Sequence, residues 1–181
     1  RAGALMHPDL VQSRQPDDVA ADLRAQIAAC RVGAVGVGAL AAELGPSVLR
    51  AWLGHLQDAA EAAVRAVLLG MPGRHAAEEV LDDGTVLDVQ LHVQGGGAVL
   101  RIVAPAHPGN RNAPGAVARA ALLYVFRCLV PDALPLNEGA LRPFAIELTP
   151  GGLFEPRPPR AVAGGNVETS QRLVDALFRA V

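Results

Sequence analysis

The first seventy residues carry a helical spacing of apolar positions. After Pro16, apolar residues recur every four positions along one face, and a second such series follows the Gly45–Pro46 pair. Proline at a helix start, acids in the first turn and glycine at the end are ordinary boundary signals. We therefore predict two helices that form a hairpin over residues 16–70, after a tail or linker of residues 1–15. The apolar positions on the first helix are Val19, Leu23 and Ile27.

The pattern then changes to a period of two. Apolar and polar positions alternate over residues 85–93, as is typical of a strand with one buried face. Gly95–Gly97 turn the chain, and residues 98–104 return as the partner strand. Residues 74–83 and 143–150 are expected to add further strands.

Residues 115–130 are nearly all apolar, so the helix they predict must be central, because it offers little polar surface to water. A final helix follows Gly164 and Gly165. The predicted fold class is α+β, with an N-terminal helical hairpin, a mixed or antiparallel sheet, a buried central helix and a C-terminal helix. In this division, residues 71–181 form the sheet and its helices.

Composition removes several classes of function. The 181 residues are 51% hydrophobic and 3% aromatic, with a net charge of −2, so a basic, ring-rich nucleic-acid surface is not expected. All sixteen basic residues are arginine, which excludes lysine chemistry. The longest apolar run, residues 120–130, is broken by Arg127 and is too short to cross a bilayer. We expect a soluble, cytoplasmic protein that binds neither nucleic acid nor a membrane.

Residues that commonly bind metals are scattered. The five histidines lie far apart without any zinc-type spacing, and we expect no metal site in this stretch. Cys30 and Cys128 lie in apolar helical patterns, where we expect them to be small buried side chains.

The segment "AVAGGNVETSQRLVD", residues 161–175, is the clearest candidate for a binding site. Asn166 has the character of a helix N-cap, which accounts for part of the pattern. Two preceding glycines would let the backbone approach a ligand closely, and polar side chains gather where free N–H groups point. The segment could therefore be a capped helix start, a site for a carbonyl or carboxylate, or both. The polar residues are Asn166, Glu168, Thr169, Ser170 and Gln171.

A second candidate is "NEGALRP", residues 137–143. Gly139 lies in a turn, and Arg142 is held before Pro143. Arg142 would pair either with an anionic ligand or with a carboxylate of its own chain.

Three blocks of this sequence resemble the hydantoinase B family, which is shared by N-methylhydantoinases, 5-oxoprolinases and acetone-type carboxylases. They are "DLRAQIAACRVGA", "RNAPGAVARAALLYVFRCLVPDALPLNEGALRP" and "EPRPPRAVAGGNVETSQRLVD". The resemblance covers residues 10–181 and implies the central segment of a B-type subunit. Where the family often has Gly-Cys before "LRP", this chain has Gly139–Ala140, so no thiol role is carried over.

The resemblance implies an ATP-dependent hydrolase of cyclic amides. It also implies a hetero-oligomer in which a hydantoinase A-type partner binds ATP, and a divalent metal bound by family motifs upstream of this segment. No cofactor is assigned to the segment itself. The alternatives are an ATP-dependent ketone carboxylase subunit of the same family, or a non-catalytic assembly segment or inactive fragment.

The resemblance also favours the two candidate segments as walls of a substrate pocket. Glu168 is the only carboxylate in its cluster, and no catalytic acid or base is assigned. The predicted substrate-binding residues are Asn112, Asn137, Arg142, Gly164, Gly165, Asn166, Glu168, Thr169, Ser170 and Gln171.

Overall fold

A computed structural model describes residues 15–131 and 137–181 of the chain. The chain divides into two compact units, residues 1–53 and 54–181, and each is described by itself. The second unit holds the sheet and the candidate site.

Two long helices come first, as expected. Helix α2 (Pro16–Leu44) begins with the predicted proline and has Asp17 and Asp18 in its first turn. It ends at Gly45, whose φ of 85° is the left-handed conformation that glycine adopts readily. Helix α3 (Pro46–Leu69) begins at once and continues into the second unit. The packing of the two helices as a hairpin stays a prediction.

Helix α2 is apolar over most of its length, although it contains no long continuous apolar run. It is long and apolar enough to cross a membrane by length and composition, with a mean hydropathy of 1.6 in its most apolar window. Its glycines and alanines separate the strongly apolar residues, so no long continuous run appears. Core helices of soluble proteins meet the same criterion, so the finding assigns no location to this helix.

The second unit is built on a four-stranded sheet in the order β1-β2-β3-β4. Strands β1 (Gly73–Val80), β2 (Val86–Gln94) and β3 (Gly97–Val103) are antiparallel neighbours, and β4 (Phe144–Leu148) runs parallel to β3. Gly95 and Gly96 form the β2–β3 turn with φ values of 59° and 73°. Two successive positive φ angles are required by the tight hairpin turn that matches strand twist. The predicted mixed sheet and its glycine turn are confirmed.

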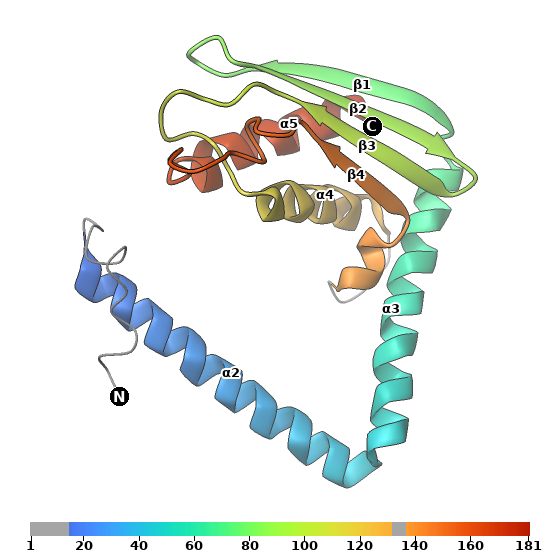
Figure 1. Ribbon diagram of the computed structural model, residues 1–181. Coiled ribbons are helices and arrows are strands. Elements are labelled where there is room, and N and C mark those ends of the chain that lie inside the picture. Colours follow the sequence, from blue (N-terminus) through green and yellow to red (C-terminus); the bar gives the residue numbers. More distant parts are fainter. Residues whose placement is uncertain (1–14, 132–136) are drawn as a thin grey trace. The chain divides into compact units, whose positions relative to one another are not determined.

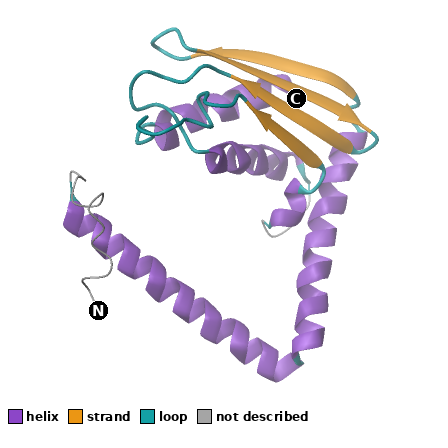
Figure 2. Cartoon of the chain, in the orientation of Figure 1, coloured by secondary structure: helices purple, strands orange, loops and turns teal. Residues whose placement is uncertain are grey.

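Helices α4 (Gly115–Leu129) and α5 (Ser170–Ala180) cover one face of this sheet, as Figures 1 and 2 show. The alternating apolar residues of β2 are fully buried against them. Helix α4 buries one side, including Leu122 and Phe126, while Tyr124 on its other side is 56% exposed. The α+β class and the core position of this helix are therefore confirmed, although the helix keeps an open side.

The parallel pairing of β3 and β4 decides where the site forms. The loops that leave these two strands, residues 104–114 and 149–164, begin at the same end of the sheet. Main-chain hydrogen bonds join them: Leu153 N–H donates to Ala104 O at 3.2 Å, and Ala113 N–H donates to Leu153 O at 2.8 Å. This loop pair supports the start of α5.

Candidate functional site

Asn112 is the centre of the loop pair. Its side chain is fully buried, and its carbonyl oxygen accepts the backbone N–H of His107 at 2.8 Å. Its amide group donates to the carbonyl oxygens of His107, Gly109 and Ala161 at 3.0, 3.2 and 3.1 Å. An amide has two donor hydrogens, and here three acceptors surround them. Asn112 therefore links the two loops through its own hydrogen bonds.

His107 lies beside Asn112 and is 8% exposed. Its Nδ1 accepts the backbone N–H of Gly109 at 2.8 Å, and its Nε2 lies 2.6 Å from a carboxylate oxygen of Asp83. Because Nδ1 accepts a hydrogen bond, the ring proton is assigned to Nε2, which donates to Asp83. Both ring nitrogens are engaged, so the pair joins this loop to the β1–β2 turn. The sequence had offered no sign of this contact.

The Asp83 carboxyl predicts a pH effect. Its pKa lies below the ordinary value, chiefly because the backbone N–H of Thr85 donates to it, with the Thr85 hydroxyl and neighbouring positive charge adding to the shift. A lowered carboxyl pKa stabilises the fold above the unfolded pKa of about 3.9, and this contribution is lost as pH falls through the folded pKa. We expect urea denaturation from about pH 5 to pH 2 to show a smaller loss of stability for Asp83→Asn than for the wild type. Parallel stability curves would contradict this assignment.

The two glycines before α5 are explained by packing within the chain. A Cβ on Gly165 would lie 2.7 Å from the carbonyl carbon of Asn112 and 2.8 Å from Cα of Ala113. One on Gly164 would lie 3.2 Å from the carbonyl oxygen of Asn110, which accepts the Gly164 N–H at 2.8 Å. The close approach that the glycines allow is thus to the loop of residues 107–113, rather than to a ligand.

The polar residues that follow divide into internal and exposed groups. Residues Gly165–Thr169 form a π-helical turn, η3, that leads into α5. Thr169 is fully buried and donates its hydroxyl to Arg111 O at 2.5 Å, and the Ser170 hydroxyl donates to Asn166 O at 2.6 Å. Asn166 lies inside the turn and its side chain caps no helix, so the N-cap expectation was wrong. The helical turn begins at Gly165 after the N-cap Gly164, two residues earlier than an N-cap at Asn166 would place it.

A polar recess opens beside this turn. Its volume is about 340 Å³, and Glu168 pairs with Arg111 at 2.7 Å on its wall. Arg172 binds Glu79 and Asp82, both at 3.1 Å. The lining residues are Leu81, Asp82, Arg111, Glu168, Gln171, Arg172 and Asp175.

Some polar groups at the recess remain available. Among the described residues, the side chains of Gln171 and Asp175 in the recess have no hydrogen-bond partner, and neither has the exposed side chain of Asn166 in the preceding turn. Sequence reasoning missed Arg172 and Asp175. Their spacing of four and seven residues from Glu168 places all three on one face of a helix, and this signal could have identified them.

Asn137 and Arg142 lie away from Asn112 and contact residues of helix α3. The Asn137 side chain accepts the Gly139 N–H at 2.8 Å and donates to Leu56 O at 3.2 Å. Arg142 binds Asp58 at 2.8 Å and Glu61 at 3.3 Å, and the hydrogen bond to Asp58 is the main reason that its pKa is raised. The sequence left open an anionic ligand or a carboxylate of the same chain as the partner of Arg142, and in the structure Arg142 binds carboxylates of its own chain.

These contacts dock the short 3-10 helix η2 (Glu138–Leu141) on α3. Gly139 fits closely there, since a Cβ on it would lie 2.7 Å from the carbonyl carbon of Gln57. Neither Asn137 nor Arg142 is among the described residues that line the recess.

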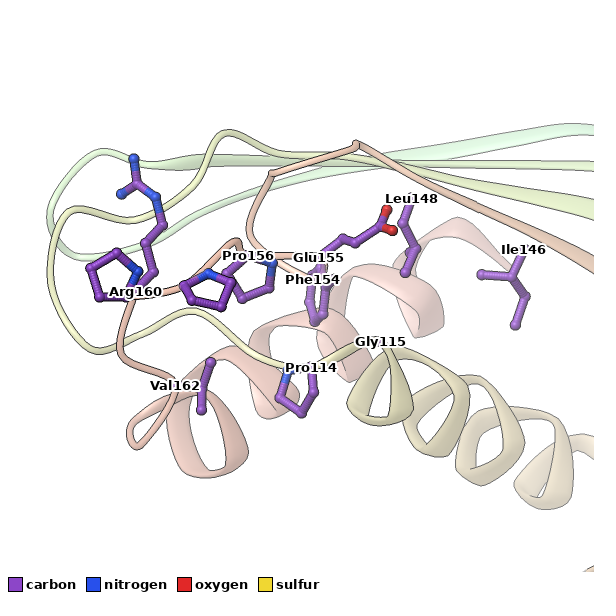
Figure 3. Close-up of a pocket in the computed structure, with 11 residues that line it drawn as sticks. Pro114, Gly115, Ile146, Leu148, Phe154, Glu155, Pro156, Arg160 and Val162 are labelled. Carbon is purple, nitrogen blue, oxygen red and sulfur yellow. The ribbon is translucent and has the colours of Figure 1, made fainter. Parts of the chain in front are cut away.

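A larger and more apolar pocket of about 790 Å³ lies at the edge of the sheet. Figure 3 shows Ile146 and Leu148 of β4 above it, with Pro114 and Gly115 at the start of α4 below. Its other lining residues are Phe154, Glu155, Pro156, Pro158, Pro159, Arg160 and Val162.

Metal-binding side chains do not gather in the described residues: no group of three or more His, Cys, Asp or Glu could hold an ion there. The expectation that the cysteines are buried was wrong, because Cys30 and Cys128 are both exposed. Cys128 lies on α4 away from the buried positions of that helix. An apolar pattern alone did not show which side of the helix faces the core.

Comparisons with known proteins agree with this architecture. The family model described as Hydantoinase B/oxoprolinase matches residues 5–181. The chain is 33% identical to the 5-oxoprolinase of Saccharomyces cerevisiae over 182 residues, covering 96% of this chain and 14% of that protein. It is 34% identical to 5-oxoprolinase 1 of Arabidopsis thaliana over 187 residues, covering 93% of this chain and 15% of that protein.

A solved structure is similar as well. The ATP-dependent caprolactamase from Pseudomonas jessenii matches with a TM-score of 0.75 and 26% identity, over 94% of this chain and 31% of that chain. The chain belongs to the hydantoinase B/oxoprolinase family. It spans about a seventh of the length of the curated relatives named above.

Proposed function

We propose that this chain is part of the B-type subunit of an ATP-dependent cyclic-amide hydrolase and contributes residues that face the substrate. The family match over residues 5–181 carries the proposal. Two relatives are named 5-oxoprolinases, and the similar structure is named an ATP-dependent caprolactamase. These names share the opening of a cyclic amide.

The proposal includes components outside this chain. We propose a hydantoinase A-type partner that binds ATP, a divalent metal bound outside the described residues, and a cytoplasmic hetero-oligomer.

The polar recess is the proposed substrate-facing surface. A volume of about 340 Å³ lies within the range of small-molecule sites. In the recess, the amide of Gln171 can donate to a ring carbonyl oxygen and the carboxylate of Asp175 can accept a ring N–H. The exposed amide of Asn166, in the turn before α5, is proposed as a further donor. A π-helical turn such as Gly165–Thr169 is frequent at functional sites, which supports this location. In this proposal these groups bind and orient the substrate, and no catalytic acid or base is assigned to them.

The activity test uses the complete B-type polypeptide together with its A-type partner. We expect ATP-dependent ring opening of 5-oxoproline, hydantoin or caprolactam, measured as released phosphate and ring-opened product. Asn166→Ala and Gln171→Ala should each lower kcat/KM about 10-fold through loss of one substrate hydrogen bond, with thermal stability unchanged. Gln94→Ala, the same change at an exposed position of the sheet, should leave kcat/KM unchanged.

Other outcomes identify the alternatives. Carboxylation of acetone by the same preparation, without amide hydrolysis, would make the chain part of a ketone carboxylase. Full turnover in both the Asn166→Ala and the Gln171→Ala enzymes would mean that these side chains do not bind the substrate, and would favour a non-catalytic assembly segment. Thr169→Ala is a poor probe of catalysis, because Thr169 is buried and its loss would destabilise the fold.

A further inference from the structure

The outer edge of β4 is a row of unpaired backbone groups. Strand β4 is the last in the sheet and pairs with β3 on one side only. Ala98 N–H donates to Pro143 O at 2.9 Å, so in the parallel ladder Ala145 and Glu147 also face β3. The N–H and C=O groups of Phe144, Ile146 and Leu148 therefore point outward.

The apolar pocket lies alongside this row. Its 790 Å³ are bounded by Ile146 and Leu148 on the strand and by Phe154 and Val162 from the following loop (Figure 3). An extended segment paired with β4 would place every second side chain on this face of the sheet. Apolar side chains at those positions could pack against Ile146, Leu148, Phe154 and Val162.

The two edges of the sheet differ. On β1, Arg179 donates to the carbonyl oxygen of Glu78 and pairs with Glu79, so this edge is charged and partly engaged. Charged side chains protect an edge against added strands. Strand β4 has a single charge, Glu147, which is paired with Arg101 at 2.8 Å, and within residues 15–131 and 137–181 no hydrogen bond to its outward groups occurs.

We propose that the β4 edge and its pocket form a docking site for an additional β-strand with apolar residues at alternating positions. The occupant is an extended segment of hydantoinase B-type polypeptide outside the stretch that residues 5–181 match. An edge strand with unpaired N–H and C=O groups and little charge is a template for pairing with a further strand. The matched stretch makes up only 31% of the caprolactamase chain and 14% of the yeast protein, so these relatives carry ample further sequence to supply such a strand. This inference rests on the family assignment and not on the hydrolase activity.

Amide hydrogen exchange tests the proposal with two neighbouring residues. In the 181-residue chain alone, we expect the Ile146 N–H to exchange at least about 100-fold faster than the Ala145 N–H, which is bonded to β3. In the polypeptide encoded by the complete reading frame, Ile146 should slow by about 100-fold, while Ala145 changes little. The measurement needs no turnover, so a failed activity assay leaves it interpretable.

Four outcomes would overturn the proposal. The Ile146 N–H could still exchange fast in the complete polypeptide. The complete reading frame could also encode no further B-type sequence. Slowing that appears only after the A-type subunit is added would make a different chain the occupant. Slowing that rises with the concentration of the 181-residue chain alone would identify a second copy instead.

Discussion

Replacing Gly165 by alanine is expected to destabilise the second unit by about 3 kcal/mol or more. The added Cβ would lie 2.7 Å from the carbonyl carbon of Asn112, and backbone atoms cannot move aside as a side-chain end can. The start of α5 or the loop of residues 107–113 would have to shift, and the hydrogen bonds of Asn112 would be strained. Thermal and urea denaturation of the purified chain measure the effect.

A matched glycine substitution provides the control. Gly33 lies within α2, and a Cβ built there meets nothing within 4 Å. Gly33→Ala should therefore be neutral or stabilise the helix by up to about 1 kcal/mol. A Gly165→Ala chain that melts with the wild type would show that the close approach to Asn112 does not exist in solution.

Replacing Asn112 by alanine is expected to cause the second large loss in the free energy of unfolding. Among the described residues, it would leave the His107 N–H and the carbonyl oxygens of Gly109 and Ala161 without their partner. Each buried group left unpaired costs about 1–3 kcal/mol, so we expect a loss of about 3 kcal/mol in the free energy of unfolding. The join between the two loops should also loosen, and this can be followed by exchange of the Gly164 N–H, which donates to Asn110 O.

Asn166→Ala is the control for this substitution. Its side chain has no hydrogen-bond partner among the described residues, and the expected change is within about 0.5 kcal/mol. Equal losses in the two variants would refute the contrast between a buried linking asparagine and an exposed one.

This contrast shows where sequence reasoning succeeded and where it stopped. The family resemblance, to which the segment of residues 161–175 contributes, is confirmed by the match over residues 5–181, while its role as a binding site stays a prediction. The roles inside it could not be ranked, because Asn166 and Thr169 are equally polar in the sequence. Only the position of Arg111, fifty-eight residues before Thr169, makes one of them a buried link.

Arg142 illustrates the same limit. Its place before Pro143 predicted an ordered side chain, but two partners remained possible. The carboxylates that bind it, Asp58 and Glu61, come from α3, more than eighty residues away in sequence. Which charge approaches a guanidinium group depends on how η2 docks on that helix.

The sequence by itself determined what local forces control: the helix start at Pro16, the glycine turn between β2 and β3, and the alternation that makes β2 a half-buried strand. Tertiary structure alone decided that Asn112 is an internal link, that Gly165 touches this chain's own backbone, and that the β4 edge stays open. The reason is physical. Backbone angles and side-chain periodicity act over a few residues, whereas close contacts and unpaired edges depend on segments brought together from distant parts of the chain.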